Sequence, residues 1–226
     1  DLSTRRFLKV IAAGGAALAA GCATRDVVVP EEGFEYRPAD PPQPVAVKGK
    51  VEVIEFFWYG CPHCWHLEPL LKKWKETMPA NAQLRRSPAI LGPTWEPLAR
   101  AYFAAELLGK AEELHEPLFE AVQVKKQRLT DADSISKFVA TLGLDPDAFK
   151  EAYGSFFVDM QVRKTMELTR IFGIDGVPAI VVNGRYRTSA SQAGGNDQRM
   201  GVVTQLIQQE SQAASAEAGA PTPGKP

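Results

Sequence analysis

The feature that most constrains this chain is a pair of cysteines separated by two residues, Cys61-Pro62-His63-Cys64. The residues before it, 51–58, are β-prone and nearly apolar, which predicts a central strand buried on both faces. The residues from Pro62 to about Met78 carry leucines and a tryptophan on one stripe, which predicts a helix. A strand that leads through a CxxC motif into a helix is typical of a redox-active thiol pair.

The two cysteines should differ in reactivity. Pro62 fits the first helical position, which places Cys61 at the N-cap, facing unpaired backbone N–H groups and the positive end of the helix dipole. A thiolate is stabilised there, so we expect a lowered pKa for Cys61, with His63 adding positive charge when protonated. Cys64 lies one turn further in, where it can close a disulfide. Stabilising the thiolate favours the dithiol, so the pair should be an oxidant.

Other uses of these residues remain alternatives. A structural disulfide across CxxC is one, although so short a loop adds little stability. A metal site made of Cys61, Cys64, His63 and His66 is another, but no second CxxC or histidine pair completes a zinc set. Covalent haem needs CxxCH, and Trp65 stands at the histidine position. We therefore expect no metal and no cofactor beyond the Cys61–Cys64 disulfide.

The first residues read as an export signal. Three basic residues precede an apolar stretch, 10–20, that is too short to span a membrane, so we assign residues 1–21 to a signal peptide. Cys22 follows Leu-Ala-Ala-Gly, which resembles a lipobox and predicts a lipidated cysteine. An ordinary signal cleaved near Ala19 or Ala23 is the alternative, and Arg5-Arg6 leaves Sec or Tat export open. Export would place the thiol pair in the oxidising periplasm.

The rest of the chain predicts one sheet interrupted by helices. Residues 22–50 are rich in proline and should form an extended linker, with a short edge strand near 34–37. A domain over 51–210 follows, with a second strand at 82–90 and an insertion over about 92–172 that shows helical spacing at 95–108, 111–124, 131–142, 146–153 and 156–172. Strands return at 178–183 and 185–188 around an Asn183-Gly184 hairpin signal. A helix at 198–210 closes the domain, and residues 211–226 should be a disordered tail.

Composition excludes several classes of protein. The net charge is −1, with 26 basic and 27 acidic residues, so nothing favours binding to nucleic acid. Three cysteines are too few for a disulfide-stapled small domain. The chain is therefore best interpreted as a globular protein with one reactive centre.

Four motifs together resemble the thiol:disulfide interchange protein DsbA family, which has the thioredoxin fold. They are Glu55-Phe56-Phe57, Cys61-Pro62-His63-Cys64, Gly176-Val177-Pro178-Ala179 and Val182-Asn183-Gly184-Arg185-Tyr186. The resemblance covers roughly residues 51–210 and implies an α/β thioredoxin fold with an inserted helical domain. It also places Val177-Pro178 as a cis-proline loop that faces the cysteines and binds substrate backbone. Reoxidation by an inner-membrane, quinone-linked partner of the DsbB type is a further implication.

Two carboxylates are candidates for proton transfer. Glu55 lies in the predicted central strand below the cysteines and could take or relay the proton of Cys64. Glu68 follows Cys64 by four residues and shares its helix face. A salt-bridged carboxylate is the alternative for each. We expect His115 to be a packed surface histidine, and Trp58 and Tyr59 to line the core or a groove.

We therefore predict an exported, monomeric oxidase that donates its disulfide to reduced or unfolded exported proteins. A disulfide isomerase or reductase of the same fold is one alternative, although residues 23–50 are too few for the added dimerisation domain of an isomerase. A non-catalytic peptide-binding module is the other.

Overall fold

The protein is built around a five-stranded mixed sheet. The computed structural model describes residues 30–46 and 49–219. The strands are β1 (Arg37–Pro38), β2 (Val51–Phe57), β3 (Ala82–Pro88), β4 (Ala179–Val182) and β5 (Tyr186–Ser189). Their order in the sheet is β1-β5-β4-β2-β3, with β2 parallel to β3 and the other neighbours antiparallel. Every residue of β2 is buried, which confirms the predicted central strand.

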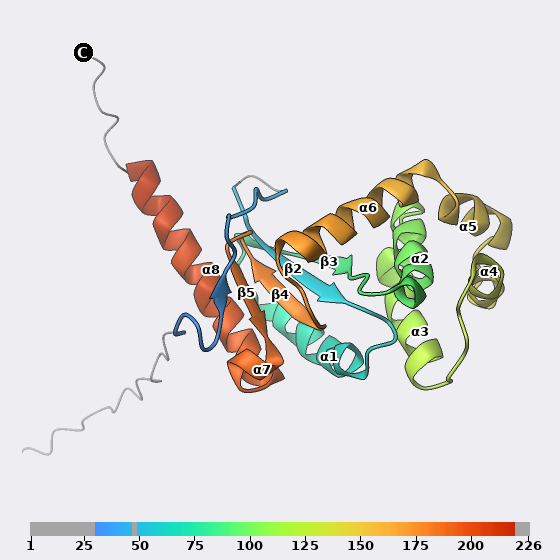
Figure 1. Ribbon diagram of the computed structural model, residues 1–226, viewed down its shortest axis with the longest axis horizontal. Helices are drawn as coiled ribbons and strands as arrows, with labels where there is room; N and C mark the ends of the chain where they lie inside the picture. Colours follow the sequence, from blue (N-terminus) through green and yellow to red (C-terminus); the bar gives the residue numbers. More distant parts are fainter. Residues whose placement is uncertain (1–29, 47–48, 220–226) are drawn as a thin grey trace, which may run out of the picture.

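Helices cover both faces of this sheet (Figure 1). Helix α1 (Pro62–Thr77) and helix α8 (Asn196–Gly219) lie side by side on one face, where the indole of Trp74 donates to Thr204 Oγ1 at 2.9 Å. Helix α6 (Phe156–Ile171) crosses near the opposite face, where residues just beyond its end, Phe172 and Ile174, pack on Ile54 and Phe56. A four-residue helix, α7 (Ala190–Ala193), joins β5 to α8. Because side chains alternate along β2, this strand contributes to two separate hydrophobic cores, one on each face of the sheet.

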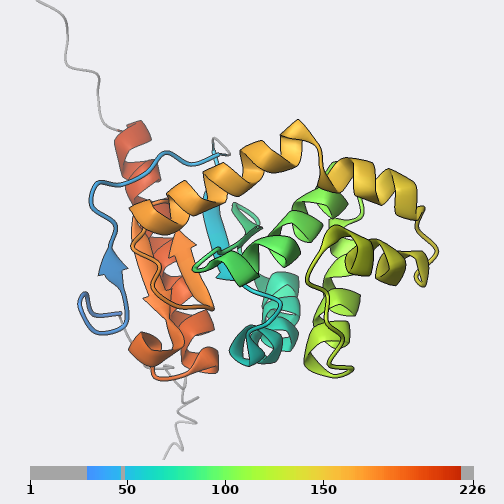
Figure 2. The same ribbon diagram turned by 45° about the vertical axis from the view of Figure 1, so that its right-hand side comes forward.

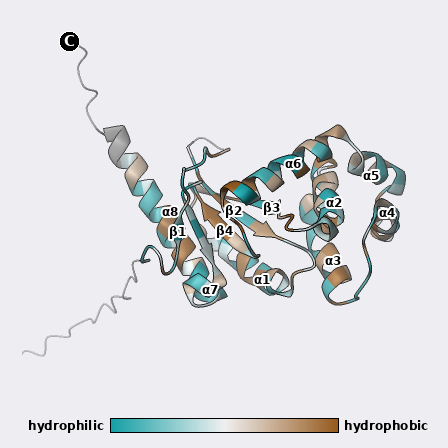
Figure 3. Cartoon of the chain, viewed as in Figure 1, coloured by the Kyte–Doolittle hydropathy of each residue, from teal (hydrophilic) through white to brown (hydrophobic). Residues whose placement is uncertain are grey.

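The helical block lies to one side of the sheet, and α6 returns the chain from it (Figures 1 and 2). Its other helices are α2 (Glu96–Leu107), α3 (Ala111–Gln123), α4 (Ala132–Ala140) and α5 (Pro146–Tyr153). The bounds differ from the predicted ones by at most two residues. Asp145 caps α5 through its side chain, and Asp131 and Ser134 form a capping box at the start of α4. Figure 3 shows hydrophobic residues concentrated in β4 and parts of α3, and hydrophilic ones dominating α5.

The proline-rich segment is not a free linker along its described length. Backbone N–H groups of Ala39 and Gln43 donate to the carbonyls of Arg185 and Gly184, at 2.6 and 2.9 Å. Tyr36 is buried against the sheet, and the edge strand lies at Arg37–Pro38 instead of 34–37. Proline content led the prediction toward an extended spacer, but a proline without an N–H is tolerated at a sheet edge. The expected signal peptide and Cys22 lie outside the described residues.

The C-terminal prediction was wrong in part. Helix α8 continues through Ser211 to Gly219, where a disordered tail was expected. The segment is rich in alanine, the best helix former, and alanine extends a helix that already exists without further packing. Ser211 is also tied to Asn81, whose side-chain amide donates to its hydroxyl at 2.6 Å.

Candidate active site

A tight turn after β2 delivers the first cysteine. The N–H of Cys61 donates to the carbonyl of Trp58 at 2.9 Å. The indole of Trp58 stacks on that of Trp95, with ring centroids 4.2 Å apart. Gly60 is required in this turn, because a Cβ there would overlap the Trp58 ring. The turn is thereby held between the sheet and the helical block.

Cys61 is the N-cap of α1 and Pro62 is its first residue, as the sequence predicts. The structure describes both cysteines as free thiols, with Cys64 fully buried and Cys61 less so. A hydrogen bond from Cys64, aided by the backbone N–H groups of Cys64 and His63 and by the charge of His63, lowers the pKa of Cys61 to about 6. Burial, together with the adjacent Cys61 sulfur, raises the pKa of Cys64 far above its usual range. The two thiols therefore differ sharply in acidity.

The loop before β4 faces these sulfurs. The Val177–Pro178 peptide is cis, as predicted. The carbonyl of Val177 accepts a hydrogen bond from Cys61 Sγ at 3.4 Å, although these residues lie 116 positions apart. The carbonyl of the next residue, Pro178, accepts a hydrogen bond from the guanidinium of Arg199 at 2.8 Å.

Glu55 is completely buried in β2 on the face that α1 covers. The strand register sets it opposite Arg86 of β3, and Arg86 Nε lies 3.4 Å from Glu55 Oε2. Burial, followed by the negative charge of Glu68, raises the pKa of Glu55 to about 8, against the opposing effect of Arg86 and Arg199. Neither carboxyl oxygen makes a hydrogen bond within the described residues. Glu55 is thus a carboxyl group that holds its proton near neutral pH.

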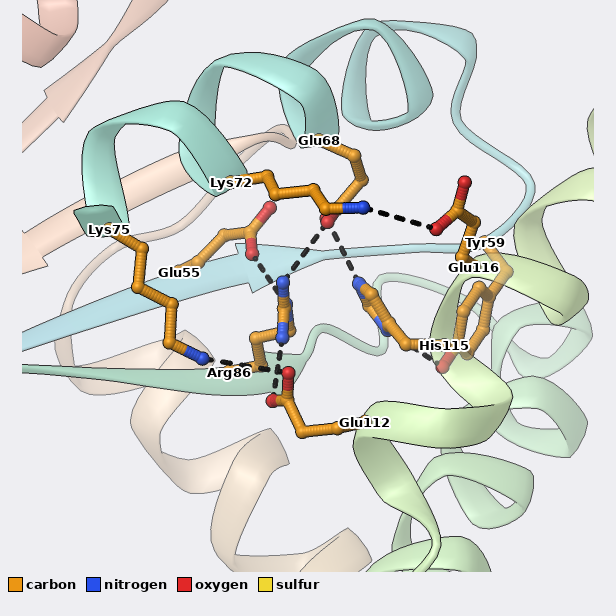
Figure 4. A network of polar contacts seen from close by, with 9 residues as sticks. All are labelled: Glu55, Tyr59, Glu68, Lys72, Lys75, Arg86, Glu112, His115 and Glu116. Atoms are coloured by element: carbon orange, nitrogen blue, oxygen red, sulfur yellow. Dashed lines mark hydrogen bonds and ion pairs between the residues drawn. The ribbon is translucent and has the colours of Figure 1, made fainter.

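Arg86 is the centre of a network that opens to solvent (Figure 4). Its guanidinium binds Glu68 at 3.1 Å and Glu112 at 2.9 Å. Glu68 also accepts from His115 Nε2 at 3.0 Å, and His115 Nδ1 accepts from the Tyr59 hydroxyl at 3.0 Å. The network lines a pocket of about 420 Å³ between α1 and α3. The pocket therefore gives water access to the charged groups of this network that line it.

The network fixes the ionisation of its members. Burial opposes a charge on Glu68, but the hydrogen bond from His115 and the charge of Arg86 outweigh it and lower the pKa of Glu68. Burial lowers the pKa of His115. An ionised Glu68 beside a neutral His115 agrees with the donor and acceptor assignment of the two ring nitrogens. Glu68 makes no hydrogen bond to either cysteine in the described part of the chain, so it meets Glu55 only through Arg86.

Several residues of this site were not found from the sequence. His115 was expected at the surface, and that is wrong: it is 4% exposed, because Tyr59 and Glu68 satisfy both of its ring nitrogens. A basic residue in the predicted strand 82–90 was the available signal for Arg86, since a charge in a buried strand needs a partner on the next one. Arg199 carried no comparable signal, since arginine in an amphipathic helix usually faces water.

Within the residues that the structure describes, no group of three or more His, Cys, Asp or Glu side chains could hold a metal ion. No helix in that same part of the chain is long and apolar enough to cross a membrane.

The fold and the thiol pair define a class. A thioredoxin-type sheet, a CxxC pair at the start of α1 and a cis-proline facing the sulfurs together define a thiol:disulfide oxidoreductase. Residues 81–208 match the family model described as DSBA-like thioredoxin domain. The chain belongs to the DsbA family.

Individual relatives agree with this assignment. The chain is 39% identical to the thiol:disulfide interchange protein DsbA of Pseudomonas syringae pv. tomato over 186 residues, which cover 82% of this chain and 87% of that protein. It is 40% identical to the corresponding protein of Azotobacter vinelandii over 167 residues, 74% of this chain and 78% of that one. The crystal structure of Pseudomonas aeruginosa DsbA superposes with a TM-score of 0.79 at 35% identity, covering 82% of this chain and 96% of that chain. The thioredoxin fold with a helical insertion is thereby confirmed.

Proposed function

We propose that this oxidoreductase acts as a thiol oxidase that donates the Cys61–Cys64 disulfide to folding proteins. The observation that carries the proposal is the placement of the two thiols: Cys61 is the N-cap of α1, and Cys64 is fully buried within that helix. In this arrangement a hydrogen bond from Cys64 lowers the pKa of Cys61 to about 6. A thiolate that is stable at neutral pH makes the dithiol the favoured state and the disulfide a strong electron acceptor. Stabilisation of the Cys61 thiolate therefore favours transfer of the disulfide from the enzyme to its substrate.

The exchange proceeds in two steps. A substrate thiolate attacks Cys61 Sγ, the Cys61–Cys64 bond breaks, and Cys64 leaves with the electron pair. A second substrate thiolate then attacks the substrate sulfur of the mixed disulfide, and Cys61 leaves as a thiolate. The low pKa of Cys61 favours this second departure, because thiols of low pKa are better leaving groups. The substrate ends with a disulfide and the enzyme with a dithiol.

The surrounding residues support these steps. Val177 and Pro178 hold the substrate backbone beside Cys61, a role favoured by the 3.4 Å contact between the Val177 carbonyl and Cys61 Sγ. His63 lowers the pKa of Cys61. Glu55 donates a proton to Cys64 as it departs, and Glu68 supports this relay through its charge, which raises the pKa of Glu55. The Cys61–Cys64 disulfide itself accepts the two electrons that the substrate thiols lose, so the reaction needs no metal or organic cofactor.

The setting follows from the sequence. A basic start, an apolar run and Cys22 favour export to the periplasm and a lipid anchor. The substrates are then reduced exported proteins, the enzyme works as a monomer, and a quinone-linked membrane protein of the DsbB type restores the disulfide.

A two-part experiment tests the oxidase. The oxidised protein is mixed with a reduced, unfolded substrate that has two cysteines, and loss of substrate thiols is followed, with Cys61→Ser as the inactive control. Titration in a glutathione buffer gives the potential of the pair, which we expect above about −180 mV, the value typical of isomerases. A lower potential, with faster repair of scrambled disulfides than oxidation of thiols, would favour the isomerase or reductase. Full cellular activity of Cys61→Ser would favour the peptide-binding module.

A further inference from the structure

A fully buried arginine lies behind the cis-proline loop. Arg199, near the start of α8, is 0% exposed and is the bulkiest of the fully buried side chains. Its Nη1 donates to the Pro178 carbonyl and its Nη2 to Asn196 Oδ1, both at 2.8 Å, while Nε has no partner in the described residues. No carboxylate of the described chain lies within ion-pair distance of it. A buried charge without a counter-ion is costly, so its presence calls for a physical reason.

The acidic groups that act on Arg199 are Glu55 and Cys64. Burial lowers the pKa of Arg199 to about 10, so the guanidinium is still charged at neutral pH. Glu55 has its pKa raised to about 8 by burial, so most of it is protonated at pH 7, and Cys64 is a thiol in the dithiol protein. In this state the arginine therefore faces two neutral acids.

We propose that Arg199 supplies the counter-charge for the thiolate that Cys64 forms when the disulfide is opened. The inference rests on the proposed donation of the disulfide. When a substrate thiolate bonds to Cys61 Sγ, the bond to Cys64 breaks and the electron pair stays on Cys64. That sulfur has no access to water, so its charge must be met by the protein. Glu55 then gives its proton to Cys64, and the negative charge passes to the Glu55 carboxylate, which Arg199 also stabilises.

The other buried cation is already neutralised. Arg86 binds two ionised carboxylates, Glu68 at 3.1 Å and Glu112 at 2.9 Å, so it adds little uncompensated positive charge. Arg199 has only neutral hydrogen-bond partners, a backbone carbonyl and an amide oxygen. Those two bonds hold the guanidinium in place without cancelling its charge. Arg199 thus stabilises negative charge at Cys64 from behind the cis-proline loop, without touching the substrate.

Two substitutions separate the charge from the hydrogen bonds. Arg199→Gln keeps a donor for the Pro178 carbonyl and removes the charge, whereas Arg199→Lys keeps the charge and loses the two-pronged donor. Asn196→Ala is the matched control, because it removes the bond to Nη2 and leaves the charge. For each variant the rate at which glutathione opens the disulfide is measured by stopped-flow fluorescence. We expect Arg199→Gln to be at least about tenfold slower than wild type, and Arg199→Lys and Asn196→Ala to stay within about threefold.

Two further measurements distinguish electrostatics from a merely structural role. NMR titration of the reduced protein should show the pKa of Glu55 rising by at least about one unit in Arg199→Gln and unchanged in Arg199→Lys. The groups facing Glu55 that could mask this shift, Glu68 and Arg86, are the same in all variants. Denaturant unfolding of the oxidised proteins should show that Arg199→Gln is not less stable than Arg199→Lys. If Arg199→Gln does not fold, Arg199→Met takes its place.

The outcomes are decisive in both directions. An Arg199→Gln rate equal to wild type, or equal losses in the Gln and Lys variants with unchanged titration of Glu55, would overturn the counter-charge role. Because each rate is compared with wild type, this result is separate from failure of the proposed function, in which the wild-type protein itself would not oxidise a dithiol substrate.

Discussion

At the scale of single residues, the site depends on an asymmetry between two identical side chains. Cys61 meets the first N–H groups of α1, whereas Cys64 is buried under the helical block. We expect iodoacetamide at about pH 6 to modify Cys61 and to leave Cys64 intact, because only a thiol whose pKa lies near 6 is substantially ionised there. Peptide mass spectrometry of the reduced protein gives the position of the label. Equal labelling of both cysteines would contradict the assigned roles.

The lowered pKa of Cys61 should also appear as a pH-dependent stability of the reduced protein. A thiol has a pKa of about 8.5 in the unfolded chain, so folding releases a proton between about pH 6 and 8.5, and stability rises with pH across this window. The gain is fully present near pH 8.5 and is lost as pH falls through 6. Glu55, with its pKa raised to about 8, makes stability fall as pH rises, but this contribution is present in both redox forms.

Comparison of the two forms therefore isolates Cys61. Urea unfolding of reduced and oxidised protein at about pH 5 and 8 should show the reduced form gaining relative to the oxidised one only at the higher pH. A difference between the two forms that does not change with pH would mean that the thiolate is not stabilised by the fold.

His63 should make a smaller contribution than its place in the motif suggests. Its charge is the least of the effects that lower the pKa of Cys61, after the hydrogen bond from Cys64 and the backbone N–H groups. We expect His63→Ala to raise the pKa of Cys61 by less than about one unit and to lower the potential by less than about 30 mV, giving a weaker oxidant. His66→Ala, an exposed histidine in the same helix, is the control and should change neither. A more oxidising His63→Ala would refute the electrostatic argument.

At the scale of elements, features that depend on interactions between residues close in the sequence were predicted more accurately than features that depend on distant ones. The caps and stripes of α2 to α6 lie within a few residues of each other, and these helices were found with nearly correct ends. The Arg86 network joins four elements, β2, α1, β3 and α3, and His115 contacts Tyr59 across 56 positions. No local pattern encodes such a contact. The cysteines were found because their chemistry is carried by spacing alone, whereas Arg199 depends on how α8 docks against β4.

The β4–β5 hairpin shows how one turn holds a distant segment. Asn183 and Gly184 both have positive φ, 52° and 64°, as the two-residue turn requires. A Cβ on Gly184 would also collide with the carbonyl of Gln43, which lies in the segment that pairs along the sheet edge. We expect Gly184→Ala to cost about 2–3 kcal/mol in unfolding free energy.

A matched substitution separates the two causes. Gly194 has φ of 79° and open space where a methyl group would be added, so Gly194→Ala carries the backbone cost alone, about 1 kcal/mol. Chemical denaturation of both variants gives the comparison. Equal losses would show that residues near Gln43 do not depend on the hairpin.

At the scale of the whole molecule, the reactive sulfurs lie where the helical block meets the sheet. Cys61 and Cys64 belong to the core cluster that includes the helical block, while Glu55 of β2 and Arg199 of α8 act electrostatically on Cys64. The helical block therefore shields the sulfurs from water on one side, and the charged groups lie on the other. Neither the helical block nor the sheet alone would provide both the exclusion of water and the charges that shift the pKa values of the two thiols.

If Cys22 is lipidated, the number of residues between it and the sheet limits how far the enzyme can lie from the membrane. Lipidation of Cys22 would anchor the protein, and it would also leave Cys61 and Cys64 as the two cysteines with unmodified thiols. The edge segment is fixed to the sheet from Tyr36 onward, fourteen residues after Cys22. Fourteen extended residues span at most about 50 Å, so the spacer reaches only about half as far as residues 22–50 would if they were all extended.

We therefore expect a lipidated enzyme that is held close to the membrane surface. Mass spectrometry of the mature N-terminus should find a diacylated or triacylated Cys22, and fractionation should move Cys22→Ala from the membrane to the soluble periplasm without loss of thiol oxidation in vitro. Because the tether is short, inserting about twenty Gly/Ser residues after Thr24 should leave the anchor intact and change the rate of reoxidation by the membrane partner. A mature chain that starts beyond Cys22, or a Cys22 with a free thiol in a soluble protein, would refute the anchor and leave the oxidase proposal in place.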